Sequence, residues 1–261
     1  MAVESTARWY DSTTLEIVQQ VKSADGKKMV KATLNHARKR GFLPSITSII
    51  KEVLASGPQL QDWIINQHLN ACISFPFDRN ISIETEVLEY KKMIMVKANE
   101  FKNKAADKGK ELHGFVDEWA RTRELPEHPI GRKICNQINS KLQSLGEVKT
   151  ITTEQSVGSL ECGFCGTPDI FVVMMDDGKF ILDLKTTSLR SYTKPYESWK
   201  TQLGGYDILT GSGATLLQAV ADRETGDVIF VEHEEPEKWN AHFQHLFECW
   251  CIQKGYNPRE I

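Results

Sequence analysis

The stretch GTPDIFVVMMDDGKFILDLKTT, from Gly166 to Thr187, decides the fold that we expect. Two apolar runs around an Asp-Asp-Gly turn are typical of a β-hairpin. We expect a three-residue loop, Asp176-Asp177-Gly178, in which Gly178 takes the left-handed conformation and Asp169 lies opposite Lys185. Because side chains alternate along a strand and opposed residues share a face, this register gathers Asp169, Asp183 and Lys185 on one face. The hairpin core is therefore expected to end in three charged side chains.

These three charges need compensation. Two neighbouring carboxylates repel each other unless a cation lies between them, and Mg²⁺ and Mn²⁺ prefer such oxygen ligands. A lysine ammonium group beside them would orient a water or stabilise negative charge on a phosphate. The trio therefore indicates metal-dependent hydrolysis of a phosphodiester. The alternative is an edge-strand salt bridge between Lys185 and one of the carboxylates.

The rest of the chain predicts helices first and then strands flanked by helices. We therefore expect an α/β fold with a mixed central β-sheet flanked by helices. Residues 1–261 are expected to form one domain, with a mainly helical front part over 1–148 and an α/β core over 149–261. Helical spacing or caps predict helices at 43–54, 58–73, 84–122 (with a break near Gly109), 128–146, 197–210 and 236–255. Alternation and turn residues predict strands at 149–157, 159–175, 179–187 and, as a pair joined by a turn, within 214–233.

Composition narrows the class of protein. The 261 residues are 40% hydrophobic and 26% charged, which is ordinary for a globular protein. No apolar run approaches the roughly 18–20 residues that cross a bilayer, so we expect no membrane partner. The first thirty residues lack the apolar core of a secretory signal, and we expect a cytoplasmic protein, with an organellar location as the alternative.

The six cysteines are expected to be free thiols. Cys162-Gly-Phe-Cys165 has the spacing of a metal-binding pair. A structural zinc normally takes four ligands, however, and no second well-spaced pair follows. We therefore interpret both cysteines as small apolar residues on a strand.

Four motifs resemble a known family. Thr-Pro-Asp at 167–169 followed by Asp-Leu-Lys at 183–185 resembles the PD-(D/E)XK nuclease signature. Gln202 and Tyr206 in QLGGY resemble the QxxxY motif of the RecB-like branch, which includes phage-type exonucleases. KGKELH, ending in His113, resembles the Gly-x-x-x-His helix of that branch. FLPSITSII, residues 42–50, is similar to the Pro-Ser-Val-Thr segment of phage and organellar members.

The resemblance implies a restriction-endonuclease-like core with a mostly antiparallel sheet. It also implies one or two Mg²⁺ or Mn²⁺ ions, with His113, Asp169, Asp183 and the backbone carbonyl of Leu184 as metal ligands. Lys185 would position the attacking water, and Gln202 and Tyr206 would share one helix face near the metals and the DNA backbone. Relatives with an iron–sulfur cluster carry their cysteines elsewhere, so no iron–sulfur cluster is expected.

Two of the implied residues have an alternative role. Glu154 would bind a metal through water or hold Lys185 in place, or it is an exposed strand residue. His113 is either a metal ligand or a half-buried helix residue with a hydrogen bond.

The expected function is a metal-dependent DNA exonuclease that acts on single- or double-stranded ends in recombination, repair or DNA processing. A structure-specific or endonucleolytic DNase and a catalytically silent DNA-binding protein remain open alternatives. A second copy of the chain or a single-strand-annealing recombination protein is a further candidate partner. Sequence-independent phosphate contacts are expected from Arg38, Lys39, Arg40, Ser45, Thr47, Thr186, Thr187, Arg190, Lys194 and Lys200. Trp9, Tyr10 and Trp199 either stack on unpaired bases or belong to the core.

Overall fold

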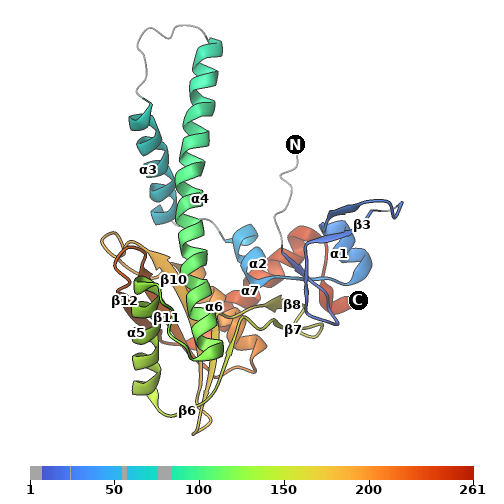
Figure 1. Cartoon of the computed structure of the whole chain (residues 1–261). Helices are drawn as coiled ribbons and strands as arrows, with labels where there is room; N and C mark the ends of the chain where they lie inside the picture. Colours follow the sequence, from blue (N-terminus) through green and yellow to red (C-terminus); the bar gives the residue numbers. More distant parts are fainter. Residues whose placement is uncertain (1–7, 24, 55–57, 76–83) are drawn as a thin grey trace. The chain divides into compact units, whose positions relative to one another are not determined.

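The computed structural model describes residues 8–23, 25–54, 58–75 and 84–261 (Figure 1). The chain divides into two compact units. The first unit comprises Met1–Ala55 and Phe115–Ile261, and the second comprises Ser56–Gly114. Residues up to 55, which the sequence assigns to the helical front, therefore share a unit with the α/β core.

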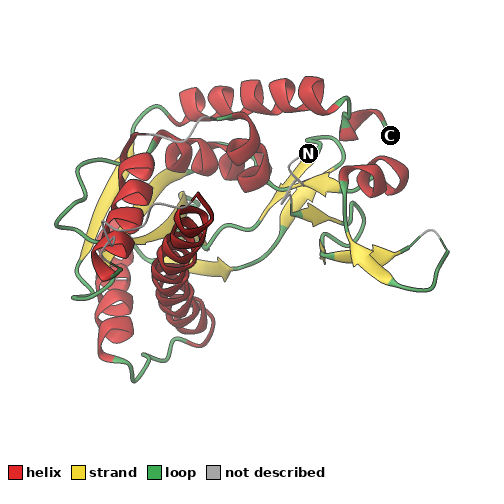
Figure 2. Cartoon of the chain, turned by 90° about the horizontal axis from the view of Figure 1, so that it is seen from above, coloured by secondary structure: helices red, strands yellow, loops and turns green. Residues whose placement is uncertain are grey.

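A five-stranded mixed sheet forms the centre of the first unit. Its strand order is β12-β11-β10-β9-β6. The pair β10 and β11 is parallel, and the other neighbouring pairs are antiparallel. Helices flank the sheet (Figure 2), so the expected α/β class is confirmed. The strands are β6 (Val148–Thr153), β9 (Ile170–Met174), β10 (Lys179–Thr187), β11 (Thr215–Asp222) and β12 (Val228–His233).

Four helices of this unit form where the sequence predicts them: α2 (Ile46–Val53), α5 (Pro129–Leu145), α6 (Glu197–Leu209) and α7 (Pro236–Lys254). A further helix, α1 (Leu34–Arg40), is not predicted by the sequence interpretation. The neighbouring glycines of QLGGY let α6 approach two other helices closely. A Cβ atom on Gly204 would lie 2.4 Å from the backbone of Trp239 in α7, and one on Gly205 would lie 3.1 Å from Ile46 in α2. This packing fixes α6 against the sheet face that carries the charged residues.

Short strands complete the first unit. β1 (Trp9–Tyr10) pairs with β2 (Ile17–Val18) and β5 (Leu43–Pro44), while β3 (Gln20–Lys22) pairs with β4 (Met29–Lys31) and β7 (Val157–Ser159) with β8 (Phe164–Gly166). Trp9 and Tyr10 are only 2% and 1% exposed, and the Trp9 ring packs against Trp250 and Tyr256. Base stacking by Trp9 or Tyr10 is thus ruled out, and the core alternative is confirmed.

The second unit is a pair of helices. α3 (Pro58–Ser74) packs through Ala71 against Ile94 and Ala98 of α4 (Glu84–Thr122), and the Tyr90 hydroxyl donates to the carbonyl of Phe75 at 2.5 Å. The expected break near Gly109 is wrong, because α4 continues without interruption to Thr122. A single glycine costs a helix only about 1 kcal/mol. None of the helices in the described ranges is long and apolar enough to span a membrane.

The decisive hairpin forms with a register shifted by two residues from the expected one. Phe171 pairs with Ile181, which places Asp169 opposite Asp183 rather than opposite Lys185. The loop is Met175-Asp176-Asp177, and Asp177, not Gly178, is left-handed with φ 65°. Aspartate tolerates this conformation better than most residues do. A shift of two preserves which side chains share a face, so all three charges still lie on one face.

Candidate active site

Asp183 is the most deeply buried charged group of the site. It lies on β10 with 1% of its surface exposed. Its Oδ1 accepts a hydrogen bond from Gln202 Nε2 at 3.0 Å, and its Oδ2 accepts from Lys185 Nζ at 2.7 Å. Burial raises the pKa of Asp183, and the nearby Asp169 raises it further, against the opposing effect of Lys185. A second positive charge beside this carboxylate would therefore be favourable.

Asp169 provides the second carboxylate. It follows the Gly-Thr-Pro bend, and its Oδ2 accepts from the backbone N–H of Leu184 at 2.7 Å. The hydroxyl of Thr153, at the end of β6, lies 2.7 Å from the carbonyl oxygen of Asp169 and 3.0 Å from Asp117 Oδ1 on α4. β10 thus holds the carboxylate of Asp169, and Thr153 of β6 holds its backbone carbonyl.

α6 contributes an amide that links the charged groups. Gln202 Oε1 accepts from Lys185 Nζ at 3.1 Å, while its Nε2 donates to Asp183 and, at 2.9 Å, to the Tyr206 hydroxyl. Tyr206 is buried, and burial followed by the two carboxylates raises its pKa well above the ordinary value, so the hydroxyl stays protonated. The i, i+4 spacing on one helix face places both QxxxY side chains at the site, as expected.

Gln218 on β11 is a site residue that the sequence interpretation missed. The parallel register places it beside Asp183, and its Nε2 donates to the Asp183 carbonyl at 2.8 Å and to Oδ2 at 2.5 Å. Its side chain is fully buried, and its Oε1 has no hydrogen-bond partner among the described residues. A glutamine inside the apolar run Leu216–Ala221 was the signal that could have identified it. Thr153 and Asp117 were also missed, and nothing in their local sequence distinguishes them.

Two further residues expected at the site are Glu154 and His113. β6 ends at Thr153, so the expectation that the strand continues through Glu154 is wrong. Glu154 is exposed and left-handed, with φ 47°. His113 is half-buried on α4 and belongs to the second compact unit, whereas both carboxylates belong to the first.

The donor chemistry of the cluster fits a hard divalent cation. The described residues contain no group of three or more His, Cys, Asp or Glu side chains that would form a metal site by themselves. Mg²⁺ does not need such a group, because it is usually bound through one or two carboxylates and keeps several waters. The facing carboxylates of Asp169 and Asp183 satisfy that requirement. Burial, followed by the repulsion from Asp169, raises the pKa of Asp183 in spite of Lys185, so a cation beside the pair would be favourable.

The cysteine pair lies in the small β7–β8 hairpin. Cys162 is in the turn and Cys165 is on β8, so only one of them is on a strand as expected. Burial raises the pKa of Cys165 to about 12, which makes it an unreactive thiol at neutral pH.

Some of the expected DNA-contact residues already have structural partners. Ser45 is 2% exposed and its Oγ caps α2 by accepting from the N–H of Ser48 at 3.0 Å, so its use as a phosphate contact is not supported. The Arg38 guanidinium group donates to the carbonyl of Lys254, and the ammonium group of Lys200 lies 5.0 Å from the centre of the Trp239 ring.

The other expected DNA contacts are accessible to different degrees. Lys39, Arg40 and Thr47 are exposed at or near the helices α1 and α2. Thr186 and Thr187 are half-buried at the end of β10, and the following loop exposes Arg190 and Lys194.

Comparison with known proteins does not assign a family. No protein-family model matches the chain, and no curated protein matches it significantly. Nineteen chains of solved structures match significantly, among them one described as "Crystal structure of SSO0001". That likeness covers 72% of this chain and 84% of that chain, with 15% sequence identity and a TM-score of 0.35. So low a TM-score supports no conclusion about activity, which has to come from the geometry of the site.

Proposed function

We propose that the protein is a Mg²⁺- or Mn²⁺-dependent deoxyribonuclease that hydrolyses phosphodiester bonds from DNA ends, in recombination, repair or DNA processing. The observation that carries the proposal is the fully enclosed Asp183. It faces a second carboxylate, Asp169, and it is held by Lys185, Gln202 and Gln218 at once. The resemblance of these positions to the PD-(D/E)XK and QxxxY motifs supports the same activity.

A purely structural salt bridge explains this arrangement less well. β10 lies between β9 and β11, and although its pairing with β9 ends at Leu182, Asp183 is enclosed rather than exposed as on an open edge strand. A buried ion pair is also weak evidence for stability, because desolvation offsets its attraction. A second carboxylate beside the pair adds repulsion, which is expected at a site that binds a cation.

The side chains suggest a division of work. A divalent ion held by Asp169 and Asp183 would supply Lewis acidity toward the phosphate and lower the pKa of a bound water. The Lys185 side chain is 21% exposed and therefore accessible from solvent, and its ammonium group would orient water or meet a phosphate oxygen. Gln202 fixes the direction of Lys185 by accepting one of its hydrogens, and Tyr206 fixes Gln202.

The surface near the site offers contacts for DNA. Trp199 lies on α6 one turn before Gln202. Its ring is parallel to that of Tyr192 at a centroid distance of 6.4 Å and tilted against that of Tyr196 at 4.4 Å. Exposed Arg190 and Lys194 lie in the same loop as Tyr192. Aromatic and cationic side chains together are typical of single-stranded nucleic-acid surfaces.

The test is cleavage of end-labelled linear DNA and closed circular DNA in the presence of Mn²⁺. An exonuclease releases nucleotides from linear DNA and spares circles, whereas an endonuclease nicks the circles. The variants Asp183→Asn and Lys185→Met are expected to cut linear DNA at least about 10²-fold more slowly than the parent, and Asp177→Asn, which changes an exposed carboxylate at the other end of the hairpin, is the matched control. Binding of DNA without cleavage under all conditions would contradict the proposal and favour a silent DNA-binding protein.

A further inference from the structure

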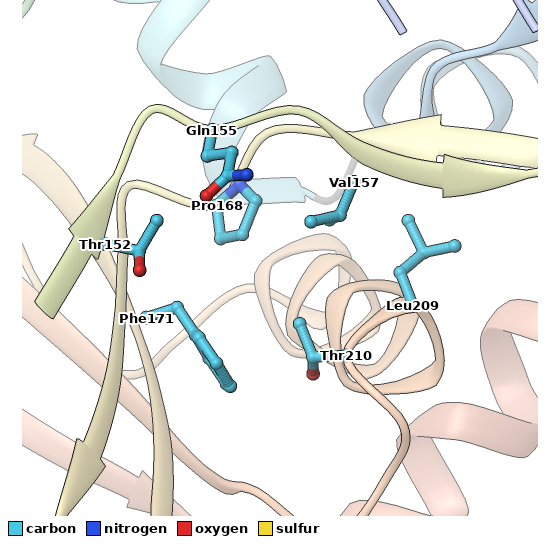
Figure 3. Close-up of a pocket in the computed structure, with 7 residues that line it drawn as sticks. All are labelled: Thr152, Gln155, Val157, Pro168, Phe171, Leu209 and Thr210. Carbon is cyan, nitrogen blue, oxygen red and sulfur yellow. The ribbon is translucent and has the colours of Figure 1, made fainter. Parts of the chain in front are cut away.

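A small pocket opens beside the carboxylate pair. It has a volume of about 250 Å³, and Figure 3 shows its side chains arranged around a common space. Val157, Pro168, Phe171 and Leu209 form its apolar lining, and Thr152, Gln155 and Thr210 supply uncharged polar groups. No charged side chain is among these lining residues. The pocket therefore suits a small, uncharged and partly polar group.

The pocket is adjacent to the site in the backbone as well as in space. Pro168 directly precedes Asp169. Phe171 is on the same strand face as Asp169, two residues and thus about 6.6 Å along the strand. Thr152 pairs with Phe171, and its neighbour Thr153 holds the carbonyl of Asp169. A molecule whose anionic group is held beside the carboxylates by a bound cation or by Lys185 would extend its uncharged part into this space.

We infer that the pocket holds one unpaired nucleobase of the strand that the protein cuts. This inference rests on the proposed function and adds a substrate class, DNA with an unpaired end. A base has a flat apolar face for the Phe171 ring and Pro168, and a polar edge for the Gln155 amide, which is the usual way in which an extruded base is read. Ordinary ligand sites occupy about 300–1,000 Å³, and this pocket lies below that range, so a single base suits it better than a larger group.

A pocket that accepts only an unpaired base restricts the DNA substrates of the protein. A base inside a duplex is stacked and hydrogen-bonded, so it cannot enter the pocket unless its pair is opened. Single strands and frayed ends offer the base without that cost. An apolar side chain of a partner protein is the competing occupant, and it would not depend on the bases of the DNA.

The test is a scan of single-stranded oligonucleotides in which one base at a time is replaced by an abasic site. Binding is measured by fluorescence anisotropy with EDTA, and cleavage is measured with Mn²⁺. For the parent protein we expect one position near the cut at which removal of the base weakens binding or slows cleavage by about 5- to 150-fold, the range for stacking of one base.

Phe171→Leu and Gln155→Ala identify the pocket as the cause. On intact DNA, each variant is expected to bind more weakly or to cut more slowly than the parent. Removal of the base at the critical position should then weaken its binding or cleavage little further. Phe230→Leu is the matched control, because Phe230 is a half-buried phenylalanine on β12, at the far edge of the same sheet. Melting temperatures of all three variants establish that they fold.

The outcomes separate the inference from the proposed function. Equal tolerance of abasic sites at every position, in a protein that cuts DNA, overturns the base pocket and leaves the nuclease intact. A full additional abasic effect in Phe171→Leu also overturns the pocket. A single critical position in binding, without any cleavage, supports the pocket and contradicts the nuclease.

Discussion

A lysine–aspartate ion pair lies at each end of the β9–β10 hairpin. The two pairs have nearly the same N–O distance, but they differ in the exposure of their side chains and in the direction of the aspartate pKa shift. At the turn, Lys149 Nζ lies 2.8 Å from Asp177 Oδ1, with side chains that are 50% and 79% exposed. At the open end, Lys185 Nζ lies 2.7 Å from Asp183 Oδ2, with side chains that are 21% and 1% exposed. The same two residue types at the same distance thus occupy opposite environments.

The electrostatic consequence is also opposite. Lys149 lowers the pKa of Asp177, whereas burial raises the pKa of Asp183 although its lysine is as close. Water solvates the turn pair, which contributes little to stability. The enclosed pair faces a second carboxylate and is held by two glutamines, as expected for a group whose charge is used. Distance alone therefore does not distinguish a functional ion pair from an incidental one.

The largest predicted effect is the difference in cleavage rate between variants of Asp183 and of Asp177. Asp183→Ala removes a proposed metal ligand, so the initial rate of nucleotide release from linear DNA is expected to fall at least about 10³-fold. Asp177→Ala is expected to retain the parent rate within twofold. Equal rates for the two variants would contradict the assignment of catalysis to Asp183.

Lys185→Met is expected to reduce the rate by about 10²- to 10³-fold. The same substitution is also expected to shift the midpoint of the pH–rate profile in a defined direction. Burial raises the pKa of Asp183 in the metal-free protein, and protonated Asp183 cannot bind a cation, so parent activity at subsaturating Mn²⁺ should fall through a midpoint as the pH is lowered. Because Lys185 lowers the pKa of Asp183, its removal should move this midpoint to higher pH.

Lys149→Met is the control for that shift. Its profile is expected to coincide with that of the parent, because Asp177 is at the other end of the hairpin. A midpoint in Lys185→Met that stays in place or moves to lower pH would contradict the role given to the ion pair.

Gln218→Leu tests the support behind the enclosed pair. Without the amide, the carbonyl and carboxylate of Asp183 lose a buried donor, so the free energy of unfolding should fall by about 1–3 kcal/mol. Urea denaturation measures this change, with the exposed Gln143→Leu expected to stay within about 0.5 kcal/mol of the parent. Identical midpoints and slopes for the two variants would show that Gln218 does not support Asp183.

The smallest predicted effect is at the turn. Asp177→Asn removes an exposed ion pair, so the melting temperature at neutral pH should hardly change, and any change should vanish at high salt. Because the pKa of Asp177 is lowered in the folded protein, its ion pair stabilises the fold at pH values above the unfolded-state pKa. This stabilisation is lost as the pH falls through the folded-state pKa. A large, salt-independent loss of stability would break the comparison.

The sequence predicts the shared face of the three charges well but not their register. Left-handed Asp177 replaces Gly178 in the loop and shifts the pairing by two residues. Alternation survives a shift of two, so Asp169, Asp183 and Lys185 still gather on one face. The register depends on which turn residue adopts the left-handed conformation, and the local sequence does not determine that choice.

What the sequence could not predict depends on contacts between distant segments. Gln218 reaches Asp183 because β11 pairs in parallel with β10, 35 residues apart in the chain. Trp9 is part of the core because Trp250 and Tyr256, near the other end of the chain, pack against it. A hydroxyl such as that of Ser45 suits a helix cap and a phosphate equally well, and only the structure shows that it caps α2.

The most direct test of the central claim is a crystal of the protein soaked in Mn²⁺ and measured for anomalous scattering. An anomalous peak between the carboxylates of Asp169 and Asp183 that disappears in Asp183→Asn is the predicted result. Absence of a peak there at saturating Mn²⁺, with both side chains ordered and Lys185 still bonded to Asp183, would contradict the account.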